Sequence, residues 1–387
     1  MNEAQTKRPM RWLAAALIAA MAAVWPWTHA TAATGMTQVT QFRTTAEIGG
    51  MTFEGRAFVL KPGQEAHLMA VKETDEGASL TAEGLTFNPI TIDKPESIQL
   101  SVLTKTHWQV QTGKITALGE RELKWVAPDR PGNYEIELTQ THTQGFENLS
   151  MSLQSKLPAT TNERAIARYT MLVMQQFDRD GNGLIGGFPI GVYPNEDGEN
   201  VKPYIAARRE KYHPPKWFIC VTPEVSNQKI SPHFRLGQFV TEWESNRPDT
   251  YIALDMRLLE RLEEIVVELN KAGHKVETLK IFRGYMSPNL VQRFRRRGGE
   301  FTDFTRQMYG DGAAFIVDAD NDGKMDDLNK DDKIDKADAE YVEQICTRLE
   351  RASGKYGGVG VYSGRTDPTT PETPWVEVDM RGNRERW

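Results

Sequence analysis

The alternation of hydrophobic and polar residues divides this chain into a β-rich first part and a mixed second part. Between residues 35 and 150, short runs with apolar residues at every second position are separated by turn residues. This two-residue period is typical of strands that bury one face. The clearest runs are Phe58-Val59-Leu60, Ile98 to Leu103, Leu123 to Val126 and Tyr134 to Leu138. We therefore predict an antiparallel β-sandwich over residues 35–150.

From about residue 205 the apolar residues follow a helical period instead. Leu258, Leu259, Leu262, Ile265, Val266 and Leu269 share one helical face, and Gly273 closes that helix. A strand containing Ile281 and Phe282 follows, and a second helix is predicted from about Lys336 to Arg351. Residues 205–387 are therefore expected to form an α+β domain. Residues 151–204, rich in Gly, Pro and Asn, are expected to connect the two domains, and Asp178–Gly183 within them is expected to be a polar turn.

The first 32 residues have the pattern of a secretory signal peptide. Lys7, Arg8 and Arg11 precede an apolar run from Trp12 to Val24, and Ala30-Thr31-Ala32 offers a cleavage site. The alternative is a membrane anchor, but the run is shorter than the roughly 20 residues that a bilayer requires. We therefore expect cleavage, a periplasmic or secreted protein, and no integral membrane segment in the mature chain.

Charge and cysteine content narrow the classes of partner. Removal of residues 1–32 leaves 44 basic and 52 acidic residues, a net charge of about −8, so nucleic-acid binding is not expected. The run Arg293–Arg297 is a local exception, either a solvated helix face or a site for an anionic wall polymer. Cys220 and Cys346 could form a disulfide in an oxidising compartment or remain free thiols.

An acidic tract within residues 318–338 has the spacing of a calcium-binding loop. Carboxylates occupy positions one, three, five and nine around Gly323 at position six, and Asn329 stands at position twelve. We predict one structural calcium ion, with the ligands Asp318, Asp320, Asp322, Asp326 and Asn329. A second register overlaps the first and uses Asp327, Asn329, Asp331, Asp335 and Asp338. The alternative is a solvated acidic loop without an ion.

Several segments of the second part, taken in order, resemble a known enzyme family. They are Ser231–Phe239, Phe282–Pro288 (FRGYMSP), Arg306–Ala314 (RQMYGDGAA), Gly357–Tyr362 (GGVGVY) and Trp375–Gly382 (WVEVDMRG). They are similar to motifs of the zinc D-Ala-D-Ala carboxypeptidases of the Hedgehog/DD-peptidase superfamily. The resemblance covers about residues 205–387 and implies that family's fold. In the first part, WVAPDRPGNYEIEL resembles the last strands of bacterial immunoglobulin-like domains.

The chain departs from the family at each zinc-ligand position. The family holds zinc with a His, an Asp seven residues later and a His in the last strand; here these positions are Gln307, Ala314 and Glu377. An amide, a methyl group and one carboxylate do not match the usual zinc ligands. The last histidine of the chain is His274. Zinc is therefore not expected.

The resemblance also implies a cleft lined by Arg283, Tyr285, Tyr309, Asp311 and Asp379, with His233 on its opposite side. We expect an inactive relative that binds peptidoglycan peptides or a cell-envelope partner. One alternative is an active hydrolase with an altered metal site around Glu377, Asp311 or His233. The other is a structural or adhesive envelope protein stabilised by calcium.

Overall fold

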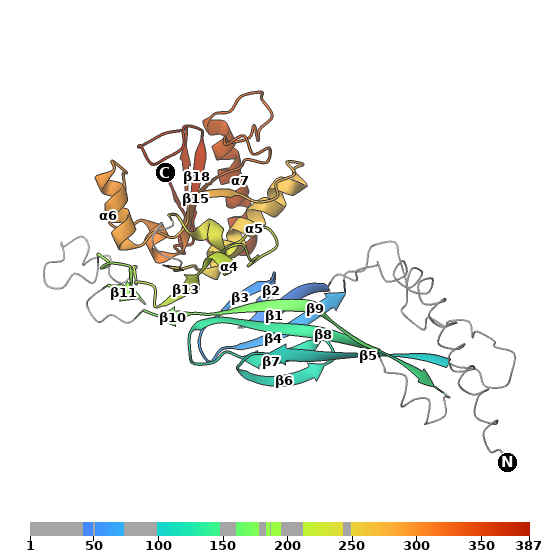
Figure 1. Ribbon diagram of the computed structural model, residues 1–387. Coiled ribbons are helices and arrows are strands. Elements are labelled where there is room, and N and C mark those ends of the chain that lie inside the picture. Colours follow the sequence, from blue (N-terminus) through green and yellow to red (C-terminus); the bar gives the residue numbers. More distant parts are fainter. Residues whose placement is uncertain are drawn as a thin grey trace, which may run out of the picture. The chain divides into compact units, whose positions relative to one another are not determined.

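The structure is a computed structural model that describes residues 42–48, 51–72, 99–147, 160–177, 183–185, 187–194, 212–242 and 249–387. The predicted signal peptide, and all of the predicted polar turn except Gly183, lie outside these residues. The described part is mostly β-sheet, with a β-rich first part and a second part that combines a sheet with helices (Figure 1).

The first part contains two sheets. One has the order β2 (Met51–Glu54), β1 (Phe42–Ile48), β4 (Glu65–Lys72), β7 (Glu122–Val126) and β6 (Lys114–Gly119); the other has the order β3 (Ala57–Leu60), β9 (Thr160–Val173), β8 (Gly132–Glu147) and β5 (Gln99–Val110). Apolar side chains at alternate positions are buried, as Leu123 and Trp125 show in β7. The strands predicted from the two-residue period are confirmed.

Strand β9 lies in the segment that was expected to be a connection. It pairs antiparallel with β8 and parallel with β3, so the β-rich part extends past the expected limit of residue 150. Its alternating residues Ala167, Tyr169 and Met171 are buried, which supplies the apolar face that a strand in this sheet needs.

The second part is organised around a five-stranded sheet. Its order is β15 (Lys280–Arg283), β16 (Gly312–Ile316), β18 (Trp375–Asp379), β17 (Gly358–Tyr362) and β19 (Glu385–Arg386). Only the β17–β19 pair is parallel. Two smaller sheets precede it: β10 (Gln175–Gln176), β13 (Trp217–Val221) and β14 (Thr250–Ile252), and the pair β11 (Leu184–Ile185) and β12 (Phe188–Pro189).

The helices of this part are α4 (Pro223–Ser226), α5 (Met256–Lys271), α6 (Pro288–Arg296) and α7 (Lys336–Ser353), with short 3₁₀ turns η2 (Leu236–Phe239) and η3 (Arg306–Tyr309). Both helices predicted from the apolar period, α5 and α7, are confirmed. Asp255 caps α5 by accepting from the Arg257 amide, and Asp335 caps α7. The helices α5 and α7 pack against each other, and α7 contacts β17 and β18 (Figure 1).

The two cysteines, Cys220 in β13 and Cys346 in α7, are both free thiols.

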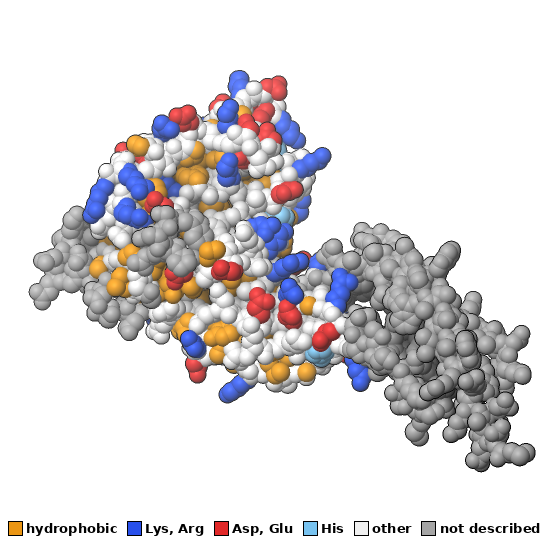
Figure 2. Space-filling view, viewed as in Figure 1, with side chains coloured by type: hydrophobic (Ala, Val, Ile, Leu, Met, Phe, Trp, Pro, Cys, Tyr) orange, Lys and Arg blue, Asp and Glu red, His pale blue; other side chains and the backbone are white. Residues whose placement is uncertain are grey.

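Arg293–Arg297 lie on α6 and at its end, where Figure 2 shows Lys and Arg side chains on the surface. Glu242 forms ion pairs with both Arg293 and Arg297, which offsets part of this positive charge. Within the described residues, no helix is long and apolar enough to cross a membrane.

Candidate functional site

The two faces of the central sheet differ, because side chains alternate along each strand. One face carries the buried apolar residues Ala313, Phe315, Val359, Val376 and Val378. The other face carries Gly312 and Ala314 in β16, Gly358, Gly360 and Tyr362 in β17, and Trp375, Glu377 and Asp379 in β18. The candidate site lies on this second face.

The three positions that the resemblance led us to compare with zinc ligands come together there. Ala314 and Glu377 are directly opposite each other in the antiparallel pair of β16 and β18. Gln307, in the 3₁₀ turn before β16, hydrogen-bonds to the Glu377 carboxyl group. The Gln307 side-chain oxygen already accepts from the Thr305 hydroxyl, so its amide nitrogen faces Glu377.

These three residues do not fit a zinc ion. Ala314 has no donor atom. Gln307 offers only a neutral amide, whose oxygen accepts from Thr305 and which is not among the usual zinc ligands. Glu377 is the one carboxylate of the three, whereas a zinc site takes three or four ligands, usually imidazole, thiolate or carboxylate. The three residues therefore lie together but do not provide the ligands of a zinc site.

Glu377 lies in an environment that disfavours its ionised form. Its side chain is only partly exposed, and burial raises its pKa to about 7. The hydrogen bond from Gln307 and the positive charges of Arg283 and Arg381 act in the opposite direction but do not offset the loss of solvation. The protonated form of this carboxyl group is therefore favoured to a higher pH than for an exposed glutamate.

Arg283 supplies a buried positive charge beside Glu377. It pairs with Ala314 across β15 and β16 and is 4% exposed. One guanidinium nitrogen donates to Asp367 and to the hydroxyl of Thr369, and the group lies 4.5 Å from the centre of the Phe301 ring. Burial lowers the Arg283 pKa, an effect that Asp367 and Glu377 partly offset. A fixed guanidinium here also disfavours a metal cation.

An aromatic group surrounds the same face. The rings of Tyr362 and Trp375 stack with centroids 3.6 Å apart, and Phe282 meets Trp375 edge-on at 5.4 Å. The Trp387 indole donates to the Tyr362 hydroxyl at 2.6 Å, and it lies so close to Gly360 that a Cβ atom there would overlap it. These aromatic residues were not predicted from the sequence to belong to the site. The glycines at alternate positions of β17 could have indicated them, since glycine in a strand often marks the close approach of another group.

Tyr285 and Tyr309, which were predicted to line the cleft, are buried in the domain core. The Tyr285 hydroxyl lies 3.1 Å from that of Tyr193, and Tyr193 also donates to the backbone oxygen of Met308. The Tyr309 ring packs against Tyr193 and Tyr212, with centroids 5.7 and 5.5 Å apart. These contacts connect η3 to the surrounding core.

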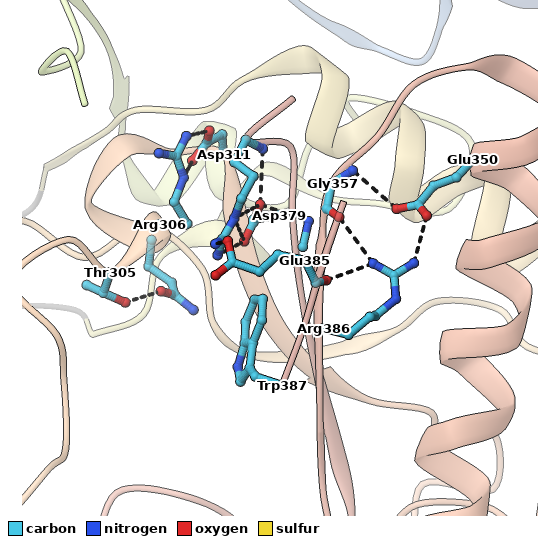
Figure 3. Close-up of polar contacts among 12 residues, drawn as sticks. Thr305, Arg306, Asp311, Glu350, Gly357, Asp379, Glu385, Arg386 and Trp387 are labelled. Carbon is cyan, nitrogen blue, oxygen red and sulfur yellow. Dashed lines mark hydrogen bonds and ion pairs between the residues drawn. The ribbon is translucent and has the colours of Figure 1, made fainter. Parts of the chain in front are cut away.

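Asp311 and Asp379 are also buried, and each is paired with an arginine (Figure 3). Arg306 donates to both carboxylate oxygens of Asp311, with a distance of 2.9 Å from Nε. Asp379 accepts from Arg381 and from the Gly358 amide at 3.1 Å. Both aspartates therefore fix the backbone around the site.

His233 has partners on helix α5. Its Nδ1 lies 2.5 Å from one carboxylate oxygen of Glu263, and its backbone amide donates to the other oxygen at 2.9 Å. The structure therefore ties His233 to α5 rather than to Glu377 on β18.

The predicted calcium ligands are brought together in part. Carboxylate oxygens of Asp318, Asp320 and Asp326 all lie within 4.8 Å of one another. Asp322 accepts from the Lys324 amide within the same loop. Asn329 lies in the following turn, where its side chain donates to Asp331.

Comparisons with family models, with curated proteins and with solved structures found no match to this chain.

Proposed function

We propose that residues 205–387 form a catalytically inactive relative of the zinc D-Ala-D-Ala carboxypeptidases, which binds peptidoglycan peptides or a cell-envelope partner without hydrolysing them. The observation that carries this proposal is the meeting of Gln307, Ala314 and Glu377 on one sheet face. Ala314 and Glu377 are 63 residues apart in the sequence, yet they are neighbours in the sheet. Their side chains nevertheless lack the donors for zinc.

The rest of the protein is proposed to serve this binding role in the cell envelope. The β-rich first part is taken as an immunoglobulin-like sandwich that acts as a spacer or a second binding module. Residues 1–32 are taken as a signal peptide that directs the chain to the periplasm or the outside of the cell. Glu377 and the rings of Tyr362 and Trp387, which are partly or fully exposed, offer the polar and apolar contacts that a peptide ligand would use.

The purified mature chain is expected to contain no stoichiometric zinc and to release no D-Ala from a stem pentapeptide. It is expected to sediment with purified sacculi and to be displaced by the soluble pentapeptide. Glu377→Gln should alter this binding, whereas Glu372→Gln, an exposed carboxylate in the preceding loop, should not. Elemental analysis, a D-Ala assay and co-sedimentation make the three measurements. Stoichiometric zinc together with D-Ala release would show an active hydrolase instead.

Restoring the family's ligands tests whether the three positions are equivalent to a zinc site. We expect Gln307→His, Ala314→Asp and Glu377→His together, combined with Arg283→Ser to remove the guanidinium, to bind one zinc ion with sub-micromolar affinity. The reason is that the backbone already places these positions together. Cobalt titration followed by visible spectroscopy would report a tetrahedral site.

The control for this variant is Gln307→His with Arg283→Ser alone, which supplies too few ligands. If the full combination folds but binds metal no better than this control, the correspondence with the family's zinc site is wrong.

A further inference from the structure

The loop that follows β16 contains a buried carboxylate oxygen without a hydrogen-bond partner. Asp318 is 6% exposed, and no described residue donates to its Oδ1. Its other oxygen accepts from the Lys280 ammonium at 2.8 Å and from the Gly323 amide at 3.1 Å. A buried carboxylate oxygen left without a partner is costly, so such an atom requires an explanation.

The surrounding carboxylates are arranged around this atom. Oxygens of Asp318, Asp320 and Asp326 lie within 4.8 Å of one another. Asp320 and Asp322 each use one oxygen to accept from an amide within the loop, at 3.1 and 2.8 Å. A carboxylate has two oxygens, so each of these residues retains an oxygen that can bind an ion.

The backbone has the form that wraps a short loop around an ion. Asn321 and Gly323 have φ angles of 61° and 90°, which reverse the chain between successive aspartates. Positions one, three, five and nine are then carboxylates, and the carbonyl of Lys324 stands at position seven. This order supplies the oxygen ligands of a calcium loop.

We propose that the loop Asp318–Asp326 binds one calcium ion through these four aspartates and the Lys324 carbonyl, independently of the function proposed above. All the ligand atoms are oxygen, whereas zinc prefers nitrogen and sulfur ligands. A zinc ion is therefore not expected in this loop. Calcium accepts six to eight oxygens in irregular geometry, whereas magnesium requires a near-ideal octahedron and keeps several waters. The ammonium of Lys280 pairs with Asp318, and four carboxylates against the two ammonium groups of Lys280 and Lys324 leave the loop with excess negative charge for a divalent ion.

The overlapping second register is not a second site, because its carboxylates already have partners. Asp338 is fully buried and accepts from the amides of Leu328, Asn329 and Asp335. Asp327 accepts from two amides of the same turn, at 3.1 and 2.8 Å. These aspartates cap α7 and close the turn. The acidic tract is therefore expected to bind one ion and not two.

The ion would join the ends of three strands of the central sheet. Lys280 is the first residue of β15, and the Asp326 amide donates to Val317, which follows β16, at 2.8 Å. The Met325 amide donates to the Thr373 hydroxyl, two residues before β18, at 2.9 Å. Those strands carry Arg283, Ala314 and Glu377, so calcium should stabilise the sheet that holds the candidate site.

The test is a calcium titration of the full chain after treatment with a chelator. Isothermal calorimetry should give one site for calcium, and calcium at a hundredfold excess over Kd should raise Tm by about 5–10 °C. Asp318→Asn should abolish both effects, and magnesium at equal concentration should bind at least tenfold more weakly. Asp331→Asn, in the second register, is the matched control and should keep one site.

Each other result would overturn the proposal or a part of it. Absence of calcium binding, or wild-type affinity in Asp318→Asn, would remove the site. Two ions, or loss of binding in Asp331→Asn, would contradict the assignment to the first register, and equal affinity for magnesium would contradict the identity of the ion. If Asp318→Asn does not fold, Asp320→Asn gives the same test from an exposed position.

Discussion

Replacing Asp311 by alanine is expected to lower the free energy of unfolding by about 3–5 kcal/mol, because it leaves the Arg306 guanidinium buried without a counter-ion. Arg306 is 8% exposed and lies over the Tyr212 and Tyr309 rings, at 5.0 and 5.4 Å from their centres. It cannot reach solvent without disrupting η3. Scanning calorimetry of the full chain should show a fall of about 10 °C in the Tm of the affected transition.

The matched control is Glu340→Ala, which removes an exposed ion pair with Lys336 on α7 and should cost less than about 0.5 kcal/mol. The double variant Arg306→Met and Asp311→Ala should recover at least half of the loss, since no uncompensated charge remains. If the double variant is less stable than Asp311→Ala, the explanation by a stranded charge is wrong.

Replacing Glu377 by glutamine is expected to stabilise the protein at high pH and to have little effect at low pH. The pKa of Glu377 is raised from 4.5 to about 7 in the folded chain. Below pH 4.5 the group is protonated in both the folded and the unfolded states, so its burial carries no ionic cost. As the pH rises through 7, the unfolded chain is ionised first, and the folded state loses stability relative to it.

The difference between the pKa values of Glu377 in the unfolded and folded states corresponds to a loss of folding stability of about 3 kcal/mol at most. The partial exposure of the side chain reduces this loss to about 2 kcal/mol. Urea unfolding of the wild type and of Glu377→Gln gives the difference in their free energies of unfolding, measured once at pH 4.5 and once at pH 8. Glu372→Gln, an exposed carboxylate, should show no such increase with pH. A difference that is the same at both pH values would contradict the assignment of a raised pKa to Glu377.

The Arg306–Asp311 pair and the Asp379–Arg381 pair hold the backbone on which Gln307, Ala314 and Glu377 converge. Glu377 carries a destabilising buried charge at high pH. We infer that these two ion pairs maintain the backbone framework of the site.

The helices and most of the strands could be predicted from sequence because their signals are local. Leu258 to Leu269 repeat with the helical period, and a second helix was predicted from about Lys336 to Arg351, so α5 and α7 were placed correctly. The motifs also predicted that Gln307, Ala314 and Glu377 belong to one site, and in the structure Ala314 and Glu377 are directly opposite each other. Strand β9 was missed because the composition of the surrounding segment, rich in Gly, Pro and Asn, outweighed its short alternating run.

The tertiary structure alone decided which side chains meet. Arg283 contacts Asp367 and Thr369, more than 80 residues later, and Trp387 covers Gly360. His233 pairs with Glu263, and one oxygen of Asp318 remains without a partner. The sequence by itself determined the elements and the residue types at the site, because both depend on neighbours along the chain. Pairing, burial and the Glu377 pKa depend on how distant segments pack, and only the folded arrangement fixes them.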